Sequence, residues 1–270
     1  MQTTRRNIVR RAASRGICVA TAAVRTVVGN NGEPAVWRGS LQAGRALSMA
    51  GREVPRLTKK YRDELAYWVE VGVNAERMFT CPYPEVFRHW QAGRMGELAE
   101  FLQLDPPAFT QWCAARTAVE IGAGPFPSIA MKAWRRAVAI DPLADGYAME
   151  NLLPPECEGV IYMAAQGEFL PLASRCADII VIENCLDHVD DPHEVLKEVV
   201  RLLRADGLLW LLVDLMDYRD HLHPNPFSEQ SLRALLADFG FDAIRERTSP
   251  HKSHPDAYGE YRGLLRKRVA

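Results

Sequence analysis

A glycine-rich turn follows a short apolar run near the middle of the chain. In AVEIGAGPFPSIA, residues 118–130, the run closes on Glu120 and the Gly122–Gly124 turn follows. Such glycines let backbone N–H groups approach a ligand closely, and the dinucleotide-binding pattern G-x-G-x-x-G is the familiar example. Pro127 stands where the third glycine of that pattern would be. Three interpretations are therefore open: a nicotinamide cofactor, another nucleotide-like ligand, or a plain strand-to-helix turn.

A second acidic residue closes the next apolar run. Asp141 lies about 20 residues after Glu120, the offset at which an acid commonly meets the ribose hydroxyls of an adenosine-containing ligand. A carboxylate accepts two hydrogen bonds there more strongly than a neutral side chain does. Together, the glycine turn and Asp141 favour an adenosine-containing ligand over a tight turn with an unrelated acid nearby.

Three histidines follow later apolar runs, where a reaction could need a general base. His188 follows the run 177–183, and His221 and His223 follow the run 207–215. Imidazole titrates nearest to neutral pH, so these three side chains are the candidate catalytic residues for a reaction at oxygen or nitrogen.

The loop that holds two of these histidines could instead bind a metal ion. His221 and His223 have Asp217 and Asp220 as neighbours in DYRDHLHPNPFS. Mixed imidazole and carboxylate sets do bind transition metals, but solvated loop side chains are far more common, and we expect no metal. The histidines of the later segment SPHKSHPDAYG are expected at the surface.

Alternating strands and helices must bring these residues to one edge of a sheet. Short apolar runs separated by helix-like or loop segments stand at 117–121, 137–140, 160–165, 177–183 and 207–215. This order predicts a doubly wound α/β domain with a mostly parallel seven-stranded sheet, covered on both faces. The last two strands, FDAIRERT and EYRGLLRKR, should form an antiparallel C-terminal hairpin. Before them, residues 228–241 predict an amphipathic helix with Ser228 as N-cap and Gly240 as its stop.

Helical patterns precede the sheet. YRDELAYWVEVGVNAERMF has apolar residues at helical spacing, and PEVFRHWQAGRMGELAEFLQL continues until two prolines, Pro106 and Pro107, break it. The chain is therefore divided into an arginine-rich N-terminal arm (1–60), partly helical or flexible, a helical lid or substrate region (61–113) and the sheet domain (114–270). Aromatic side chains of the lid region could cover a ligand or simply pack between domains.

The composition narrows the classes of function. The 270 residues are 48% hydrophobic with a net charge of -1, so the overall charge does not point to nucleic acid. No apolar stretch is long enough to span a bilayer, and six scattered cysteines favour reduced thiols in a cytoplasmic protein. The arginines of the arm weakly resemble an export signal or a transit peptide, but a helix or arm is the favoured interpretation. A homodimer is left open.

The motifs from residue 117 to 241 follow one order. The glycine turn and Asp141 are followed by AAQGEFLPLAS, by ENCLDHVDDPHEVLKEVV and by RLLRADG before the fifth apolar run ends. This order resembles the class I S-adenosylmethionine-dependent methyltransferase family, whose members show an acid-x-Gly-x-Gly turn, a ribose acid, an acid-Ala-Glu-x-Leu-Pro segment and an Asn-x-Leu-x-His-Val segment. Each motif is weak alone, and their shared order is the specific signal.

The resemblance implies how the chain would hold S-adenosylmethionine. It places Glu120 and the turn of Gly122, Ala123 and Gly124 beside the methionyl part. It places Asp141 at the ribose and Leu143 against the adenine.

The resemblance also assigns the later motifs. Gln166, Gly167 and Glu168 would read the adenine edge, with Gln166 where the family often has Asp. An amide oxygen can accept the same hydrogen bond with less charge assistance. Glu183 and Asn184 would lie beside the sulfonium and the acceptor, and the family commonly uses the histidine at position 188 to hold its loop.

Pro125 and Pro127 are expected to stiffen the turn and to serve the first position of a following helix. Pro127 also argues against a nicotinamide cofactor. A dinucleotide fold needs a small residue there for close packing around a pyrophosphate, which a methionyl tail does not have. The sequence therefore predicts a cytoplasmic methyltransferase that transfers a methyl group in line to a small molecule or glycan precursor. The alternatives are a non-catalytic module that binds S-adenosylmethionine and, less favoured, a nicotinamide-dependent oxidoreductase.

Overall fold

The sheet predicted from the sequence is present. The computed structural model describes residues 58–251 and 254–268, so nearly all of the arm predicted for 1–60 lies outside the described residues. The seven strands, in the order β3-β2-β1-β4-β5-β7-β6, are β1 (Thr117–Ile121), β2 (Arg136–Ile140), β3 (Ile161–Met163), β4 (Ala177–Glu183), β5 (Leu203–Leu215), β6 (Phe241–Ser249) and β7 (Gly259–Lys267). β1 to β5 pair in parallel, and β7 runs antiparallel to both β5 and β6. The fold class is confirmed.

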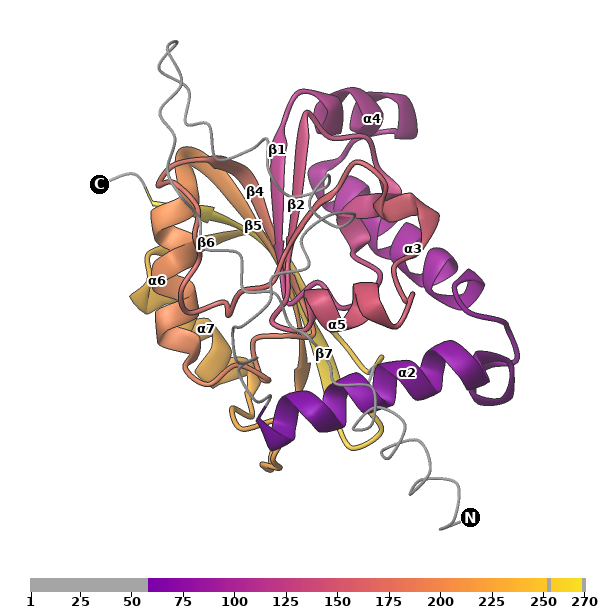
Figure 1. The fold of residues 1–270 in the computed structure, drawn as a ribbon. Coiled ribbons are helices and arrows are strands. Elements are labelled where there is room, and N and C mark those ends of the chain that lie inside the picture. Colours follow the sequence, from indigo (N-terminus) through magenta and orange to yellow (C-terminus); the bar gives the residue numbers. More distant parts are fainter. Residues whose placement is uncertain (1–57, 252–253, 269–270) are drawn as a thin grey trace, which may run out of the picture.

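Helices cover both faces of the sheet (Figure 1). They are α2 (Lys59–Phe79), α3 (Glu85–Leu102), α4 (Pro106–Ala114), α5 (Ala144–Met149), α6 (Pro192–Leu202) and α7 (Glu229–Asp238), with 3₁₀ turns η3 (Ser128–Met131) and η4 (Pro155–Cys157). α6 and α7 pack on one face and α3 and α4 on the other. Successive strand residues supply the two cores in turn, since Val119 lies in the first and Ala118 in the second.

Local sequence signals explain several element ends. The Ser228 hydroxyl accepts a hydrogen bond from the Ser231 N–H and begins α7, and Gly240 follows the helix with φ of 75°, as predicted. The two prolines expected to break the second helix instead stand at the start of the next one. α3 already ends at Leu102, and Pro106 begins α4 behind the N-cap Asp105.

The segment after β1 differs from the prediction. Pro125 and Pro127 were expected to serve the first position of an α-helix, but only the short turn η3 follows, and it begins at Ser128. Pro127 is its N-cap, with an extended backbone. α3, which precedes β1 in the chain, packs against η3 and covers this part of the sheet.

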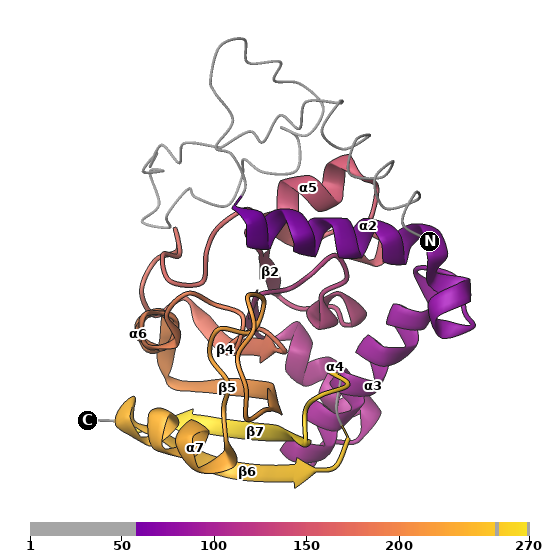
Figure 2. The ribbon, with the colours of Figure 1, turned by 90° about the horizontal axis from the view of Figure 1, so that it is seen from below.

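Helix α2 crosses the edge of the sheet at which the parallel strands end (Figures 1 and 2). Leu65 packs against Leu143 and Tyr147 beside α5, and Val71 packs against Phe87 and Phe126. α2 therefore lies over the edge where α/β proteins bind their ligands. No helix of the described ranges has the length and apolar content needed to cross a membrane.

Candidate functional site

The glycine turn is fixed by backbone hydrogen bonds and by close packing. The N–H groups of Gly122 and Ala123 donate to Ile140 O at 2.8 and 3.2 Å. Gly122 has φ of 69° and Gly124 has φ of 58°, a region that residues with a side chain rarely adopt. A Cβ at position 122 would overlap Cys185 Sγ. The turn therefore requires glycine at position 122 for its backbone angle and for its space.

Glu120 connects the end of β1 to the segment that follows the glycine turn. Its carboxylate accepts hydrogen bonds from the N–H groups of Ser128 and Ile129 at 3.1 and 2.9 Å, so it fastens η3 to the end of β1. Burial, together with the charge of nearby Glu183, raises the pKa of Glu120 to about 8. Glu120 and the turn both line a cavity above the strand ends.

Asp141 lies at the end of β2 and faces a carboxylate from α2. Its Oδ2 accepts from Gly124 N at 2.9 Å and its Oδ1 accepts from Leu143 N at 2.8 Å. Burial raises the pKa of Asp141 to about 6. Burial first and the charge of Asp141 second raise the pKa of Glu64 to about 7. Both carboxyl groups line the cavity, and the sequence motifs indicate only one of them.

Leu143 does not line the cavity, although it was predicted to lie against a ligand. It is 1% exposed and packs with Leu65 and Tyr147 under α2. Its neighbour Pro142 lines the cavity instead. The motif offset located the segment correctly, but α2, which the motif does not include, draws Leu143 into the core.

The segment after β3 contributes three predicted residues to the wall. Gln166, Gly167 and Glu168 all line the cavity. Nε2 of Gln166 donates to the hydroxyl of Tyr61 on α2 at 3.0 Å. Glu168 Oε1 accepts from the N–H groups of Asp190 and Asp191 at 2.8 and 3.2 Å, so this carboxylate holds the loop after β4.

Glu183 and Asn184 line the cavity where β4 ends. The Glu183 carboxylate accepts from Trp210 Nε1 at 2.8 Å and pairs with Arg94 of α3 at 3.3 Å. Asn184 has φ of 52°, and its Nδ2 donates to Asp214 at 3.4 Å. Its Oδ1 is buried without a hydrogen-bond partner. The wall here thus holds one satisfied buried charge and one unsatisfied acceptor.

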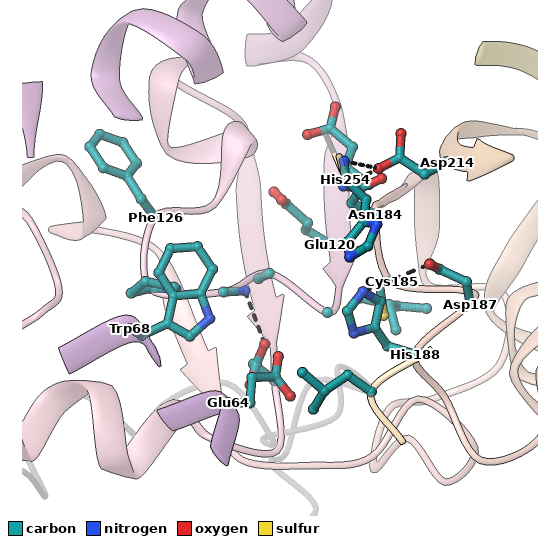
Figure 3. Close-up of a pocket in the computed structure, with 18 of the residues that line it drawn as sticks. Glu64, Trp68, Glu120, Phe126, Asn184, Cys185, Asp187, His188, Asp214 and His254 are labelled. Carbon is teal, nitrogen blue, oxygen red and sulfur yellow. Dashed lines mark hydrogen bonds and ion pairs between the residues drawn. The ribbon is translucent and has the colours of Figure 1, made fainter. Parts of the chain in front are cut away.

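The cavity has a volume of about 1130 Å³ and reaches from the glycine turn to aromatic side chains of α2 and α3. Trp68 and Trp90 lie 5.5 and 5.1 Å from Phe87, measured between ring centroids. Figure 3 shows Trp68 and Phe126 on one side of the cavity and Asp187, His188 and His254 on the other. One chamber therefore joins the predicted motifs to an aromatic wall.

The three candidate catalytic histidines do not lie together. His188 and His223 both line the cavity, with ring centroids 4.3 Å apart. His221 is exposed and its Nε2 lies 3.2 Å from Asp63 Oδ2, outside the lining. Burial lowers the pKa of His188 to about 3, so this imidazole is neutral at physiological pH.

The prediction that the histidines of the last loop lie at the surface is wrong for His254. It is half-buried, lines the cavity and lies 4.6 Å from the His223 ring. Its backbone N–H donates to Asp214 at 2.7 Å, which draws the loop between β6 and β7 inward. His251 is exposed and also lines the cavity.

Sequence reasoning also missed Glu64, Trp90 and Arg94 in the wall. Trp90 and Arg94 are four residues apart on α3, so they project from the same side of that helix. Helical spacing could have found that face, but no local signal shows that α2 and α3 fold back over the strand ends.

Comparisons with known proteins find methyltransferases among the similar sequences. Residues 119–211 match the family model described as a methyltransferase domain. An uncharacterized methyltransferase of Mycobacteroides abscessus is 32% identical over 100 residues, which are 34% of this chain. The matched part spans 38% of that curated relative.

Two solved structures show the same fold. One is the 1,6-didemethyltoxoflavin-N1-methyltransferase of Burkholderia thailandensis, with bound 1,6-didemethyltoxoflavin and S-adenosylhomocysteine. It is 18% identical with a TM-score of 0.51, covering 80% of this chain and 93% of that one. The other is a 4+2 cyclase, 13% identical with a TM-score of 0.55, covering 82% of this chain and 100% of that one. At these identities the likeness concerns the fold alone, and one fold hosts different reactions.

Proposed function

We propose that this chain, which belongs to the class I S-adenosylmethionine-dependent methyltransferase family, binds S-adenosylmethionine in the cavity and transfers its methyl group to a small-molecule acceptor. The observation that carries this proposal is one chamber that joins the glycine turn and Asp141 to the aromatic wall. Its volume of about 1130 Å³ exceeds the roughly 300–1,000 Å³ of a typical pocket for one small ligand. There is room for a cofactor and an acceptor side by side.

The facing carboxylates fit the ribose of the cofactor. Asp141 is held in place by the N–H groups of Gly124 and Leu143, and Glu64 faces it from α2. Hydroxyl groups between two carboxylates can donate to both, and such charge-assisted hydrogen bonds are about twice as strong as neutral ones. We therefore assign Asp141 and Glu64 to the two ribose hydroxyls.

The segment after β3 fits the adenine. The Gln166 amide donates to Tyr61, so its Oε1 is turned to act as an acceptor for an exocyclic amine. Gly167 supplies a backbone N–H beside it, and Pro142 replaces Leu143 as the residue expected against the ring. Glu168 acts through the loop that it holds.

The other end of the chamber fits the methionyl part. The cofactor supplies an electrophilic methyl group on sulfur, and the chain has to orient it and exclude water. The unsatisfied Oδ1 of Asn184 can accept a hydrogen bond from an ammonium group. Glu183 adds negative charge at the end of β4, which favours the positively charged sulfonium and ammonium groups. The pKa of Glu120, raised to about 8 by burial and by the charge of Glu183, would fall when such a positive group binds beside it.

The acceptor is assigned to the aromatic wall. The apolar ring faces of this wall, those of Trp68, Phe87 and Trp90, can pack against a flat ring or a sugar. Glycan precursors should therefore be tested as acceptors together with other small molecules. We interpret residues 61–113 as a lid over the domain 114–270. We expect the reaction to take place in the cytoplasm, because the cofactor is a metabolite of that compartment.

A general base is needed only if the acceptor must lose a proton. His221 lies outside the cavity, so His188 and His223 are the remaining candidates. His223 is the better placed, because Asp220 Oδ1 lies 3.0 Å from its Nδ1 and leaves Nε2 for the acceptor.

Calorimetry with S-adenosylhomocysteine and with NAD tests the cofactor. We expect binding of S-adenosylhomocysteine with a dissociation constant in the micromolar range or below, and no comparable heat from NAD. Asp141→Asn should weaken binding about 10- to 100-fold, as expected for hydrogen bonds to a charged group. Asp206→Asn, an exposed position at the start of β5, should bind like the parent. Binding of NAD alone, or equal affinity of the Asp141 variant, would contradict the proposal.

A further inference from the structure

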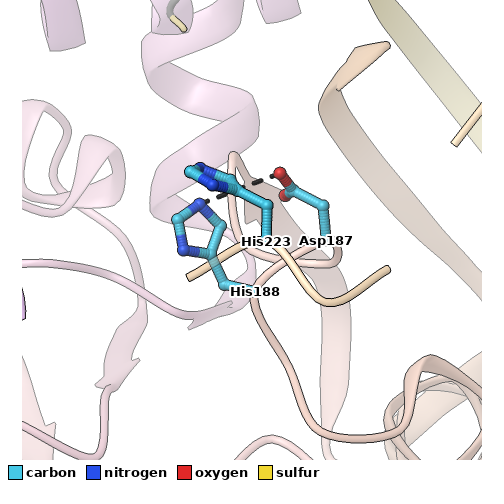
Figure 4. Close-up of side chains that lie close together, drawn as sticks. All are labelled: Asp187, His188 and His223. Atoms are coloured by element: carbon cyan, nitrogen blue, oxygen red, sulfur yellow. Dashed lines mark ion pairs between the residues drawn. The ribbon is translucent and has the colours of Figure 1, made fainter. Parts of the chain in front are cut away.

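Histidine and aspartate side chains gather on the cavity wall opposite Trp68, around His223. Asp187, His188 and His223 each offer a ligand atom, and these atoms lie within 4.8 Å of one another. Asp220, His223 and His254 form a second such set. Figure 4 shows the rings of His188 and His223 next to each other, with Asp187 beside them. Three imidazoles and two carboxylates thus converge from three separate loops.

The Asp187 carboxylate is buried with one of its two oxygens unpartnered. Its side chain is 2% exposed, and its Oδ1 has no hydrogen-bond partner. Its Oδ2 lies 3.8 Å from His188 Nε2, which is beyond hydrogen-bonding distance. A buried carboxylate without partners costs several kcal/mol unless it is paired or binds a cation. The unpartnered Oδ1 of Asp187 can therefore bind a cation.

The hydrogen bonds around His223 orient its imidazole as imidazoles are oriented in metal sites. Asp220 Oδ1 lies 3.0 Å from His223 Nδ1 and also accepts the His223 N–H at 2.7 Å. A histidine that binds a metal commonly donates its other ring N–H to a carboxylate in this way. Asp214 accepts the His254 N–H, and the Asn225 N–H donates to Asp187 O, so the loops that carry the ligands are tied together.

The local charge also favours a cation. Asp187, Asp214 and Asp220 surround the imidazoles, and Lys60 of α2 donates to the backbone O of His188. These three carboxyl groups outnumber the Lys60 ammonium group, which favours binding of a cation. Imidazole with carboxylate suits zinc and its transition-metal neighbours better than magnesium or calcium.

We propose that Asp187, His188 and His223 bind one divalent transition-metal ion, with His254 close enough to join them. Three protein ligands leave a coordination position for water or for an acceptor oxygen. This role in the reaction depends on the proposed function, because an oxygen bound to the ion would lose its proton more easily. In that case His223 acts as a ligand and not as the base. Metal binding itself does not depend on methyl transfer.

Metal titration of chelator-treated protein tests the site directly. We expect one Co²⁺ per chain, with the visible ligand-field absorption of a four- or five-coordinate ion, and displacement of Co²⁺ by Zn²⁺. His223→Ala should weaken binding at least about 100-fold, and Asp220→Asn about 10- to 100-fold through loss of the orienting hydrogen bond. His193→Ala, an exposed histidine on α6, is the control and should bind like the parent.

Asp187→Asn keeps the shape of the side chain and guards against a folding defect in His223→Ala. It should also lose most of the Co²⁺ affinity. The proposal is overturned if the parent binds neither ion stoichiometrically, or if both site variants bind like the parent. S-adenosylhomocysteine binding is measured on the same metal-free samples. If it persists while Co²⁺ fails to bind, only the metal site is wrong, and the reverse result contradicts only the proposed function.

Discussion

The pairing of Glu64 with Asp141 predicts that cofactor affinity depends on pH. Burial raises the pKa of Glu64 to about 7 and that of Asp141 to about 6. Without ligand, the pair therefore carries protons well above the usual range of carboxyl groups. Both groups must be ionised to accept from two ribose hydroxyls, so binding releases protons and strengthens as the pH rises.

The magnitude follows from the ionised fractions. A group with a pKa of about 7 is ionised in roughly nine chains of ten at pH 8 and in about one of ten at pH 6, a tenfold change that equals about 1.4 kcal/mol. Asp141, with a pKa of about 6, adds roughly a further twofold. We expect the affinity for S-adenosylhomocysteine to fall about 20-fold from pH 8 to pH 6.

Calorimetry across this range, with Glu64→Gln beside the parent, is the assay. The variant should bind weakly at pH 8 and keep only the small dependence due to Asp141. Its melting temperature at pH 8 should not fall. The raised pKa of Glu64 means that its ionisation destabilises the folded protein progressively from about pH 4.5 to about pH 7, and this loss is complete at pH 8. Glu70→Gln, on the same helix and outside the cavity, is the control. An affinity of the parent that is constant between pH 6 and pH 8 would refute the reasoning.

Three further substitutions test the packing of the site. Gly122→Ala should lower the free energy of unfolding by about 2–4 kcal/mol, because position 122 has a left-handed backbone and a Cβ there would overlap Cys185. A Cβ at position 122 would lie 2.0 Å from Cys185 Sγ and 2.4 Å from Cys185 Cβ, so the double variant with Cys185→Gly should recover the overlap part. Additive losses in urea titrations would contradict this. Arg94→Ala should lower the free energy of unfolding by about 3 kcal/mol, because it leaves the buried Glu183 carboxylate without its cation. Adding Glu183→Gln should restore most of that free energy, and no recovery would show that the ion pair does not stabilise the fold. Trp90→Ala should raise the acceptor KM about 2- to 10-fold and leave S-adenosylhomocysteine affinity unchanged; a loss in the latter would assign Trp90 to the cofactor instead.

The sequence predicts the sheet well because each strand carries its own signal. TAVEI and ADIIVIE are short and, apart from their acids and Thr117, apolar, and the structure gives them the predicted limits as β1 and β4. Burial on both faces forces this composition on central parallel strands. The motif order then locates the cavity, because the strand ends meet at one edge.

The sequence does not predict contacts made by elements that return from elsewhere in the chain. Leu143 was expected to face a ligand, but Leu65 of α2 covers it. His254 was expected at the surface, but the hydrogen bond from its N–H to Asp214 brings it into the cavity wall. Glu64 gives no motif signal, since its role depends on where α2 crosses the sheet. An α-helix was also expected after Pro127, but only the short turn η3 follows. α3, from an earlier part of the chain, packs over η3 instead.

Transfer of a labelled methyl group tests the central claim most directly. The purified protein is incubated with methyl-labelled S-adenosylmethionine and a small-molecule metabolite extract, and the label is followed by chromatography. We predict label in a low-mass product, with Asp141→Asn reducing the yield at limiting cofactor. Tight cofactor binding without transfer to any fraction, glycan precursors included, would contradict the claim and favour a module that only binds the cofactor.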